Sequence, residues 1–248
     1  MDLKRTFMKF QMTYMNENLI QIAKEIIDKA DSKGLALKAF GRIGVAIACG
    51  MEQIETQDID LFSLDAQENH LIRFFKEIEY PHKRVLPGMM VFWNNDKTVK
   101  VDVYLKELVF AFKIPGPFSP SNQYTIPITQ LFLSKLYFSD EDWSDKEKND
   151  LVNILRTHQI GRLKNPQIIQ IELLQETWCC NSDGFANFSF CEKKLLKLLE
   201  KCDDEPEVRE KIEYILEVIR KTPKKCPYKI GKCFHYGSPN VVEDAFLN

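Results

Sequence analysis

Two aspartates, two residues apart in a run of strand-forming residues, constrain the fold of this chain more than any other feature. In the segment 56–62, Asp58 and Asp60 alternate with Ile59 and Leu61. Side chains two apart lie on the same face of a β-strand, so both aspartates should point one way while the apolar residues enter the core. Two adjacent carboxylates repel each other and lose solvation unless a cation lies between them. The run predicts a strand that carries a metal site.

The composition is that of an ordinary globular protein. The chain has 248 residues, 44% of them apolar and 28% charged, with a formal net charge of -2. This balance argues against disorder and against a dedicated basic DNA binder, so no DNA partner is expected. No apolar run approaches the roughly 20 residues that span a bilayer, and the first 15 residues lack a signal-peptide pattern. We expect a cytoplasmic protein with no membrane partner.

A glycine-marked break separates a buried strand from a short helix upstream of the aspartates. The pattern predicts a helix over 16–33 ended by Gly34, a strand over 35–40, and a helix over 45–49. Between the last two lies Gly41-Arg42-Ile43-Gly44. A glycine at a strand-to-helix turn lets backbone N–H groups approach a phosphate, to which the helix N-terminus adds a favourable partial charge. The alternative is a tight turn without a ligand.

A third carboxylate follows in a predicted hairpin, after a helix over about 66–80. Residues 88–93 and 98–105 alternate like strands around a polar turn at 94–97. In the second strand, Asp102 lies on the opposite face from Val101 and Val103. Beside the strand of Asp58 and Asp60, Asp102 would complete a carboxylate triad. Alternatively, it lies on the solvent face of an edge strand.

Downstream of a proline-rich stretch near residue 120, the pattern becomes helical, with helices expected over about 127–136, 145–158, 166–178, 192–201 and 205–220. We therefore predict an α+β chain. Residues 1–124 would form a mixed sheet flanked by helices, and residues 125–248 a mainly helical domain. Near the end, four lysines surround Tyr228, which suits either a solvated surface or contact with RNA. These lysines are Lys224, Lys225, Lys229 and Lys232.

Five segments in order resemble the nucleotidyltransferase superfamily, which includes DNA polymerase beta, the minimal nucleotidyltransferases and the abortive-infection toxin nucleotidyltransferases. The segments are 43–47 (IGVAI), 58–61 (DIDL), 101–104 (VDVY), 125–136 (TIPITQLFLSKL) and 146–150 (KEKND). The likeness is greatest to the last two groups and covers about 37–156. Ile43 precedes Gly44 where the family usually has Gly-Gly or Gly-Ser, and Glu147 replaces an Asp.

The resemblance implies transfer of a nucleoside monophosphate from a nucleoside triphosphate to an acceptor hydroxyl, with release of pyrophosphate. Asp58, Asp60 and Asp102 would be catalytic and hold Mg²⁺ or Mn²⁺. The nucleotide would be bound by Arg42, Ile43, Gly44, Lys135, Lys146 and Asp150.

The resemblance leaves the acceptor open. Toxin members act on transfer RNA, which implies RNA as acceptor and an antitoxin-like protein as partner. Other members modify small molecules, as antibiotic-resistance enzymes do, and a non-catalytic nucleotide-binding or interaction module is a third reading. The sequence names neither the base nor the oligomeric state.

Overall fold

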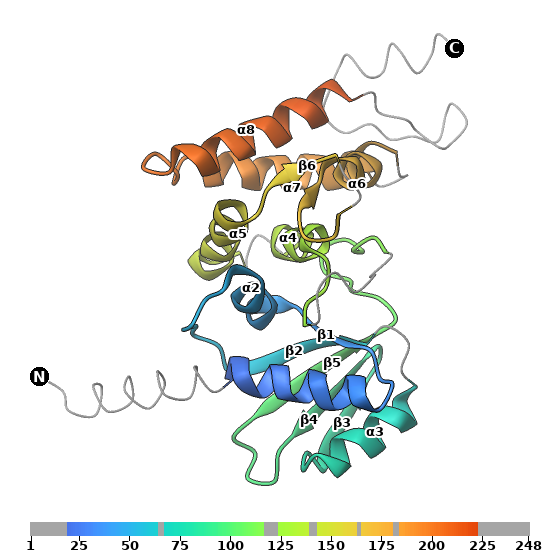
Figure 1. Cartoon of the computed structure of the whole chain (residues 1–248). Helices are drawn as coiled ribbons and strands as arrows, with labels where there is room; N and C mark the ends of the chain where they lie inside the picture. Colours follow the sequence, from blue (N-terminus) through green and yellow to red (C-terminus); the bar gives the residue numbers. More distant parts are fainter. Residues whose placement is uncertain are drawn as a thin grey trace, which may run out of the picture. The chain divides into compact units, whose positions relative to one another are not determined.

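The computed structural model describes residues 19–63, 67–116, 124–138, 143–162, 165–180 and 184–222. These residues divide into two compact units, with the boundary between Thr157 and His158 (Figure 1). The first unit contains a mixed sheet and helices, and the second is mainly helical, so the predicted α+β class is confirmed.

A five-stranded mixed sheet forms the centre of the first unit, in the order β1-β2-β5-β4-β3. Its strands are β1 (Leu37–Ala39), β2 (Asp58–Ser63), β3 (His82–Leu86), β4 (Met89–Trp93) and β5 (Lys100–Leu105). Strands β2 and β5 are parallel, and the other neighbours are antiparallel. The parallel pair places Asp60 directly opposite Asp102.

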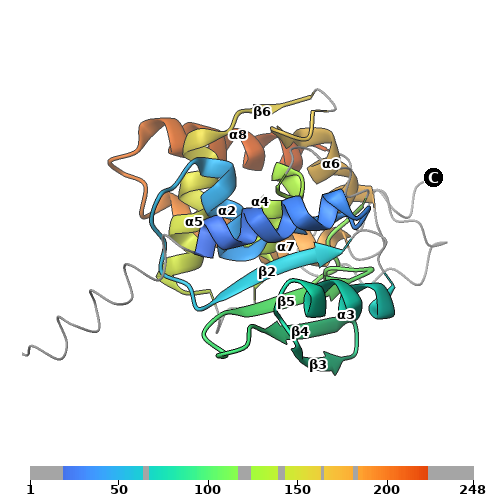
Figure 2. The same ribbon diagram turned by 60° about the horizontal axis from the view of Figure 1, so that its bottom comes forward.

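One face of the sheet is packed against the helix over residues 19–32, in front of the strands in Figure 1, and against α3 (Glu68–Glu77), in front of β4 and β5 in Figure 2. The strands contribute alternate apolar side chains to this core, including Ile59, Leu61, Val101 and Val103. This alternation is the one the sequence predicted, and it turns the aspartates to the other face.

Three further helices complete the first unit: α2 (Gly41–Cys49), α4 (Ile128–Leu136) and α5 (Asp145–Thr157). They pack against one another, and α2 also contacts β1 and β2. Ser144 caps α5, because its Oγ accepts a hydrogen bond from the Lys146 N–H at 3.2 Å. Helices α4 and α5, which follow the proline-rich stretch, therefore belong to the first unit.

The second unit holds the two-residue parallel strands β6 (Ile160–Gly161) and β7 (Ile169–Gln170). These are followed by α6 (Ile171–Gln175), the π-helical turn η1 (Glu176–Cys180), α7 (Gly184–Leu199) and α8 (Pro206–Lys221). Trp178 is fully buried in this unit, and Arg220 of α8 pairs with Glu192 of α7 at 2.7 Å.

Three expectations need correction. The boundary predicted at 124/125 lies instead at 157/158, because α4 and α5 pack on α2 within the first unit. Strand β3 was not predicted, since its residues are largely exposed and lack an alternating apolar pattern. The helix predicted over 166–178 is broken into a short strand, α6 and η1.

Candidate functional site

The three predicted acids lie on one face of the parallel strand pair, at the edge of a cleft of about 720 Å³ within the first unit. Asp58 and Asp60 come from β2, and Asp102 from β5. Neighbouring strands are about 4.8 Å apart, so the register holds the carboxylates of Asp60 and Asp102 close together. Thr56 orients Asp58 by donating from Oγ1 to its Oδ1 at 3.3 Å. The predicted grouping of three carboxylates is present.

A lysine side chain bridges two of these acids. Lys100 lies opposite Asp58 in the strand register and two residues before Asp102. Its Nζ is 2.7 Å from Asp102 Oδ2 and 3.3 Å from Asp58 Oδ2. The ammonium group therefore supplies the positive charge that paired carboxylates require.

Asp60 is the acid that this lysine does not contact. Burial, followed by the charges of Asp58 and Asp102, raises the pKa of the Asp60 carboxyl to about 7. Burial also raises the pKa of Asp102, against the lowering effect of Lys100. The site has an excess of negative charge that a further cation would relieve.

The acids are of a chemical kind that suits Mg²⁺ or Mn²⁺, which take carboxylate oxygens. Asp102 Oδ1 is buried and has no hydrogen-bond partner among the described residues. Within the same part of the chain, no three His, Cys, Asp or Glu side chains are already arranged around a common ion position. The Lys100 ammonium group contacts Oδ2 of both Asp58 and Asp102.

Helix α2 begins at Gly41, directly against Asp60. Gly41 has a φ of +60°, and a Cβ there would lie 2.2 Å from Asp60 Oδ2 and 3.1 Å from Asp60 Cβ. The Phe40 N–H donates to the Asp60 carbonyl oxygen at 3.0 Å, which fixes the strand to the helix start. The N–H groups in the first turn of a helix have no partner within the helix, so this end attracts anions.

The structure places Ile43 and Gly44 differently from the predicted phosphate turn. Ile43 and Gly44 belong to α2 and are buried, and neither lines the cleft. The Gly44 N–H donates to the Phe40 carbonyl oxygen at 2.9 Å and is not available to a phosphate. Position 44 has little room for a residue larger than glycine, because a Cβ there would lie 3.0 Å from the Ala39 carbonyl oxygen. Gly41 and Arg42 take the place in the cleft that the sequence assigned to Ile43 and Gly44.

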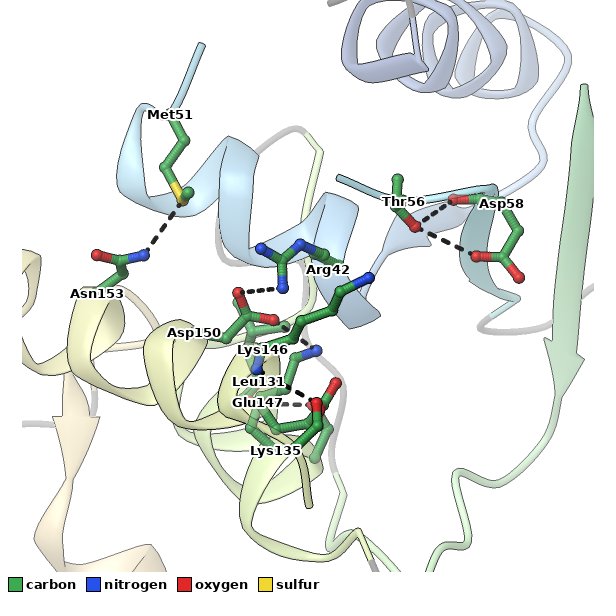
Figure 3. A network of polar contacts seen from close by, with 12 residues as sticks. Arg42, Met51, Thr56, Asp58, Leu131, Lys135, Lys146, Glu147, Asp150 and Asn153 are labelled. Carbon is green, nitrogen blue, oxygen red and sulfur yellow. Dashed lines mark hydrogen bonds and ion pairs between the residues drawn. The ribbon is translucent and has the colours of Figure 1, made fainter. Parts of the chain in front are cut away.

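Arg42, Lys135 and Asp150 form an ion cluster that joins α2, α4 and α5 (Figure 3). The buried carboxylate of Asp150 lies 2.8 Å from Lys135 Nζ and 3.4 Å from Arg42 Nη1. Arg42 Nε is buried without a hydrogen-bond partner among the described residues, although the side chain borders the cleft. Asp150 therefore holds two cations beside the cleft, and its own carboxylate faces them.

Lys135, which the resemblance assigned to the nucleotide, lies in the last turn of α4. Its side chain is only 3% exposed, and the charge is paired in the interior. Lys146 is the exposed cation, at the start of α5 and on the cleft wall.

Sequence reasoning did not assign a role in the site to Gly41, Lys100 or Tyr104. The signal for Lys100 and Tyr104 was available, since the alternation that placed Asp102 also places them on its face. The lysines 224, 225, 229 and 232 lie outside the described residues.

Solved structures resemble the chain, and they include the following two. One is the antibiotic-resistance factor ANT(2'')-Ia, with 14% identity, 57% of this chain and 84% of that chain covered, and a TM-score of 0.45. The other is an antigenic nucleotidyltransferase-like protein from Paracoccidioides brasiliensis, with 12% identity, coverage of 84% and 94%, and a TM-score of 0.44.

No protein-family model matches the sequence, and no curated protein matches it. Within the described ranges, no helix combines the length and apolar character needed to cross a membrane.

Proposed function

We propose that this protein transfers a nucleoside monophosphate from a nucleoside triphosphate to an acceptor hydroxyl. One observation carries the proposal: the opposed pair Asp60 and Asp102, with Asp58 beside them, shares a cleft with the N-terminus of α2 at Gly41. Carboxylates for a divalent cation and backbone donors for a phosphate are the two elements that phosphoryl transfer needs close together.

The cleft contains separate groups for the two ends of a triphosphate. Mg²⁺ or Mn²⁺ held by Asp58, Asp60 and Asp102 would supply positive charge for the phosphate oxygens near the reacting phosphorus. The N–H groups at Gly41 and the unpartnered Nε of Arg42 would bind the polyphosphate, with Lys146 at the rim. Ile43 and Gly44 would support this end of α2 from within.

Asp102 is placed to take the proton of the acceptor. Its Oδ2 contacts Lys100 and would bind the cation that displaces this lysine, which leaves the unpartnered Oδ1 as the acceptor atom. The hydroxyl proton would pass to Oδ1 as the hydroxyl oxygen forms a bond to the α-phosphorus. The bond from that phosphorus to the bridging oxygen breaks, and pyrophosphate leaves.

The test is transfer of label from an α-³²P-labelled nucleoside triphosphate mixture to cellular RNA, protein or small molecules. We expect Asp58→Ala and Asp60→Ala to abolish transfer, and EDTA to do the same. Asp102→Asn should lower turnover by about 10²-fold or more, with a smaller change in nucleotide affinity. Asp203→Ala, at an exposed carboxylate in the second unit, is the control. Undiminished transfer in excess EDTA would overturn the proposal.

For the acceptor we favour RNA, which rests on the basic segment 224–232 and on the family resemblance. An antitoxin-like partner would follow from a toxin role. Label appearing in RNA supports this choice, whereas label only in protein or only in a small molecule replaces it. Metal-dependent binding of the triphosphate without any labelled product would identify a non-catalytic binding module.

A further inference from the structure

Four aromatic side chains form a continuous row along the cleft, which we call the aromatic wall: Phe40, Tyr104, Phe110 and Phe138. Phe40 meets Tyr104 edge to face at a centroid distance of 4.9 Å and lies 6.5 Å from Phe110. Phe110 and Phe138 are stacked at 5.2 Å with an interplanar angle of 30°. These residues come from the position just before α2, from β5, from the loop after β5 and from the segment just after α4.

The wall is a surface and not a part of the closed core. Phe40 is 2% exposed and supports the row from beneath, whereas Tyr104, Phe110 and Phe138 are half-buried and line the cleft. Half-exposed aromatic rings keep apolar area in contact with water, and covering that area with a flat ligand is favourable.

The two ends of the wall reach the charged groups of the site. Tyr104 lies two residues after Asp102 on β5, and so on the same face of the sheet. At the other end, Lys135 Nζ lies 5.6 Å from the centre of the Phe138 ring. A ligand on the wall would therefore extend from carboxylates to cations, which suits a flat ring joined to a chelating polyanion.

A nucleoside triphosphate has this shape and charge. Its base is a π-surface, and bases stack favourably on aromatic side chains without requiring a particular sequence. The volume of about 720 Å³ falls within the range of small-molecule clefts.

We propose that Phe110 and Phe138 are the stacking surface for the base of the nucleoside triphosphate, supported by Phe40 and Tyr104. This inference rests on the proposed function and specifies where the base lies. Stacking depends on ring area, so purine bases should use the wall more than pyrimidine bases.

The experiment compares three ligands by calorimetry in the presence of Mg²⁺: inorganic tripolyphosphate, and the α,β-methylene analogues of ATP and CTP, which cannot be cleaved at the reacting bond. The variant is Phe110→Leu with Phe138→Leu, which keeps apolar bulk but removes the π-faces. The control is Phe112→Leu, because Phe112 packs edge to face on Tyr137 and does not line the cleft. Urea unfolding checks that each variant is folded, and Phe138→Leu alone replaces the double variant if that one is unstable.

We expect the wild type to bind the ATP analogue more tightly than tripolyphosphate. The double variant should bind the ATP analogue about tenfold more weakly than the wild type does. Its affinity for the CTP analogue should fall less, and its affinity for tripolyphosphate should not change. If tripolyphosphate binds but the nucleotide affinities do not respond to the substitutions, the inference fails and the proposed function stands. If none of the three ligands binds to the wild type, the proposed function fails and the inference fails with it.

Discussion

The side chain of Lys100 balances part of the negative charge of the three aspartates. Its ammonium group contacts Asp58 and Asp102, and it is partly exposed, so it can leave without opening the core. A divalent cation has to compete with this ammonium for the same oxygens. Lys100 therefore lowers the affinity of the site for a divalent cation.

We predict that Lys100→Met binds Mn²⁺ about five- to tenfold more tightly than the wild type, because the competing charge is removed. The metal-free variant should lose about 1–2 kcal/mol of unfolding free energy, since the carboxylates repel each other without it. Electron paramagnetic resonance of free Mn²⁺ measures the affinity, and urea unfolding in EDTA measures the stability. Lys113→Met, at an exposed pair with Glu107, should change neither. Weaker Mn²⁺ binding in Lys100→Met would show that the lysine supports the metal site.

Comparing Gly41 with Gly50 separates two effects of an alanine substitution at Gly41: backbone strain and contact with Asp60. Gly41 and Gly50 have φ values of +60° and +66°, but only at Gly41 does a Cβ meet another residue, Asp60. Both substitutions to Ala should cost about 1–2 kcal/mol from the left-handed backbone. Only Gly41→Ala should also displace the Asp60 carboxylate and weaken Mn²⁺ binding by about tenfold or more. Equal effects on metal binding would mean that contact with Asp60 is not important.

The raised pKa of Asp60 predicts that the free energy of unfolding depends on pH. Its pKa is raised from 3.8 to about 7, so the native state binds more protons than the unfolded chain between these values. The contribution to stability is present below about pH 4 and is lost as the pH rises through 7. In EDTA, the wild type should therefore lose more stability than Asp60→Asn between pH 5 and pH 8, measured by urea unfolding. Added Mn²⁺ should reverse the difference. A parallel pH profile in the two proteins would contradict the raised pKa.

At the level of elements, the sequence predicted the features that follow from the alternation and spacing of residues. The period of two placed Asp58, Asp60 and Asp102 on one face, and the parallel register of β2 and β5 then brought them together. The start of α2 was predicted at residue 45, four residues after its actual start at Gly41, because positive φ at Gly41 and helical packing at Gly44 both select glycine. Nothing in the spacing of α4 shows that Lys135 meets Asp150, since that contact depends on how two helices pack.

The ion cluster changes what is expected of Lys135. Replacing it with Met leaves the buried Asp150 with only the more distant Arg42, which should cost about 3 kcal/mol. A loss of nucleotide affinity in Lys135→Met alone would therefore have two explanations. Either Lys135 contacts a phosphate, or the loss of its ion pair with Asp150 disturbs the packing of α4 and α5. The double substitution Lys135→Met with Asp150→Leu removes both charges and should recover part of the stability.

If Lys135 reaches the triphosphate, the double variant should still bind tripolyphosphate several-fold more weakly than the wild type, despite the recovered stability. Urea unfolding and calorimetry give the two quantities. Tripolyphosphate affinity that returns together with stability would assign Lys135 to the fold alone.

At the scale of the whole molecule, the question is how a chain with a net charge of -2 would bind an acceptor. A small molecule needs only a cleft, whereas RNA needs several phosphate contacts whose affinity falls steeply with salt. The first unit contains the cleft and the acids, but many of its lysines and arginines are paired with carboxylates. The segment 224–232 concentrates four lysines in nine residues, and it lies outside the described part.

We predict that the wild type binds bulk transfer RNA at about 50 mM salt and loses most of this binding by about 200 mM. Replacing Lys224, Lys225 and Lys229 with Ala should reduce the slope of log affinity against log salt by about 2–3, as each lost phosphate contact lowers it by nearly one. The control replaces three exposed lysines of the first unit, Lys29, Lys76 and Lys83, which gives the same change in net charge. An equal slope change in both triple variants would indicate nonspecific attraction. No RNA binding at the lower salt, by a protein that binds nucleotide, would indicate a protein or small-molecule acceptor.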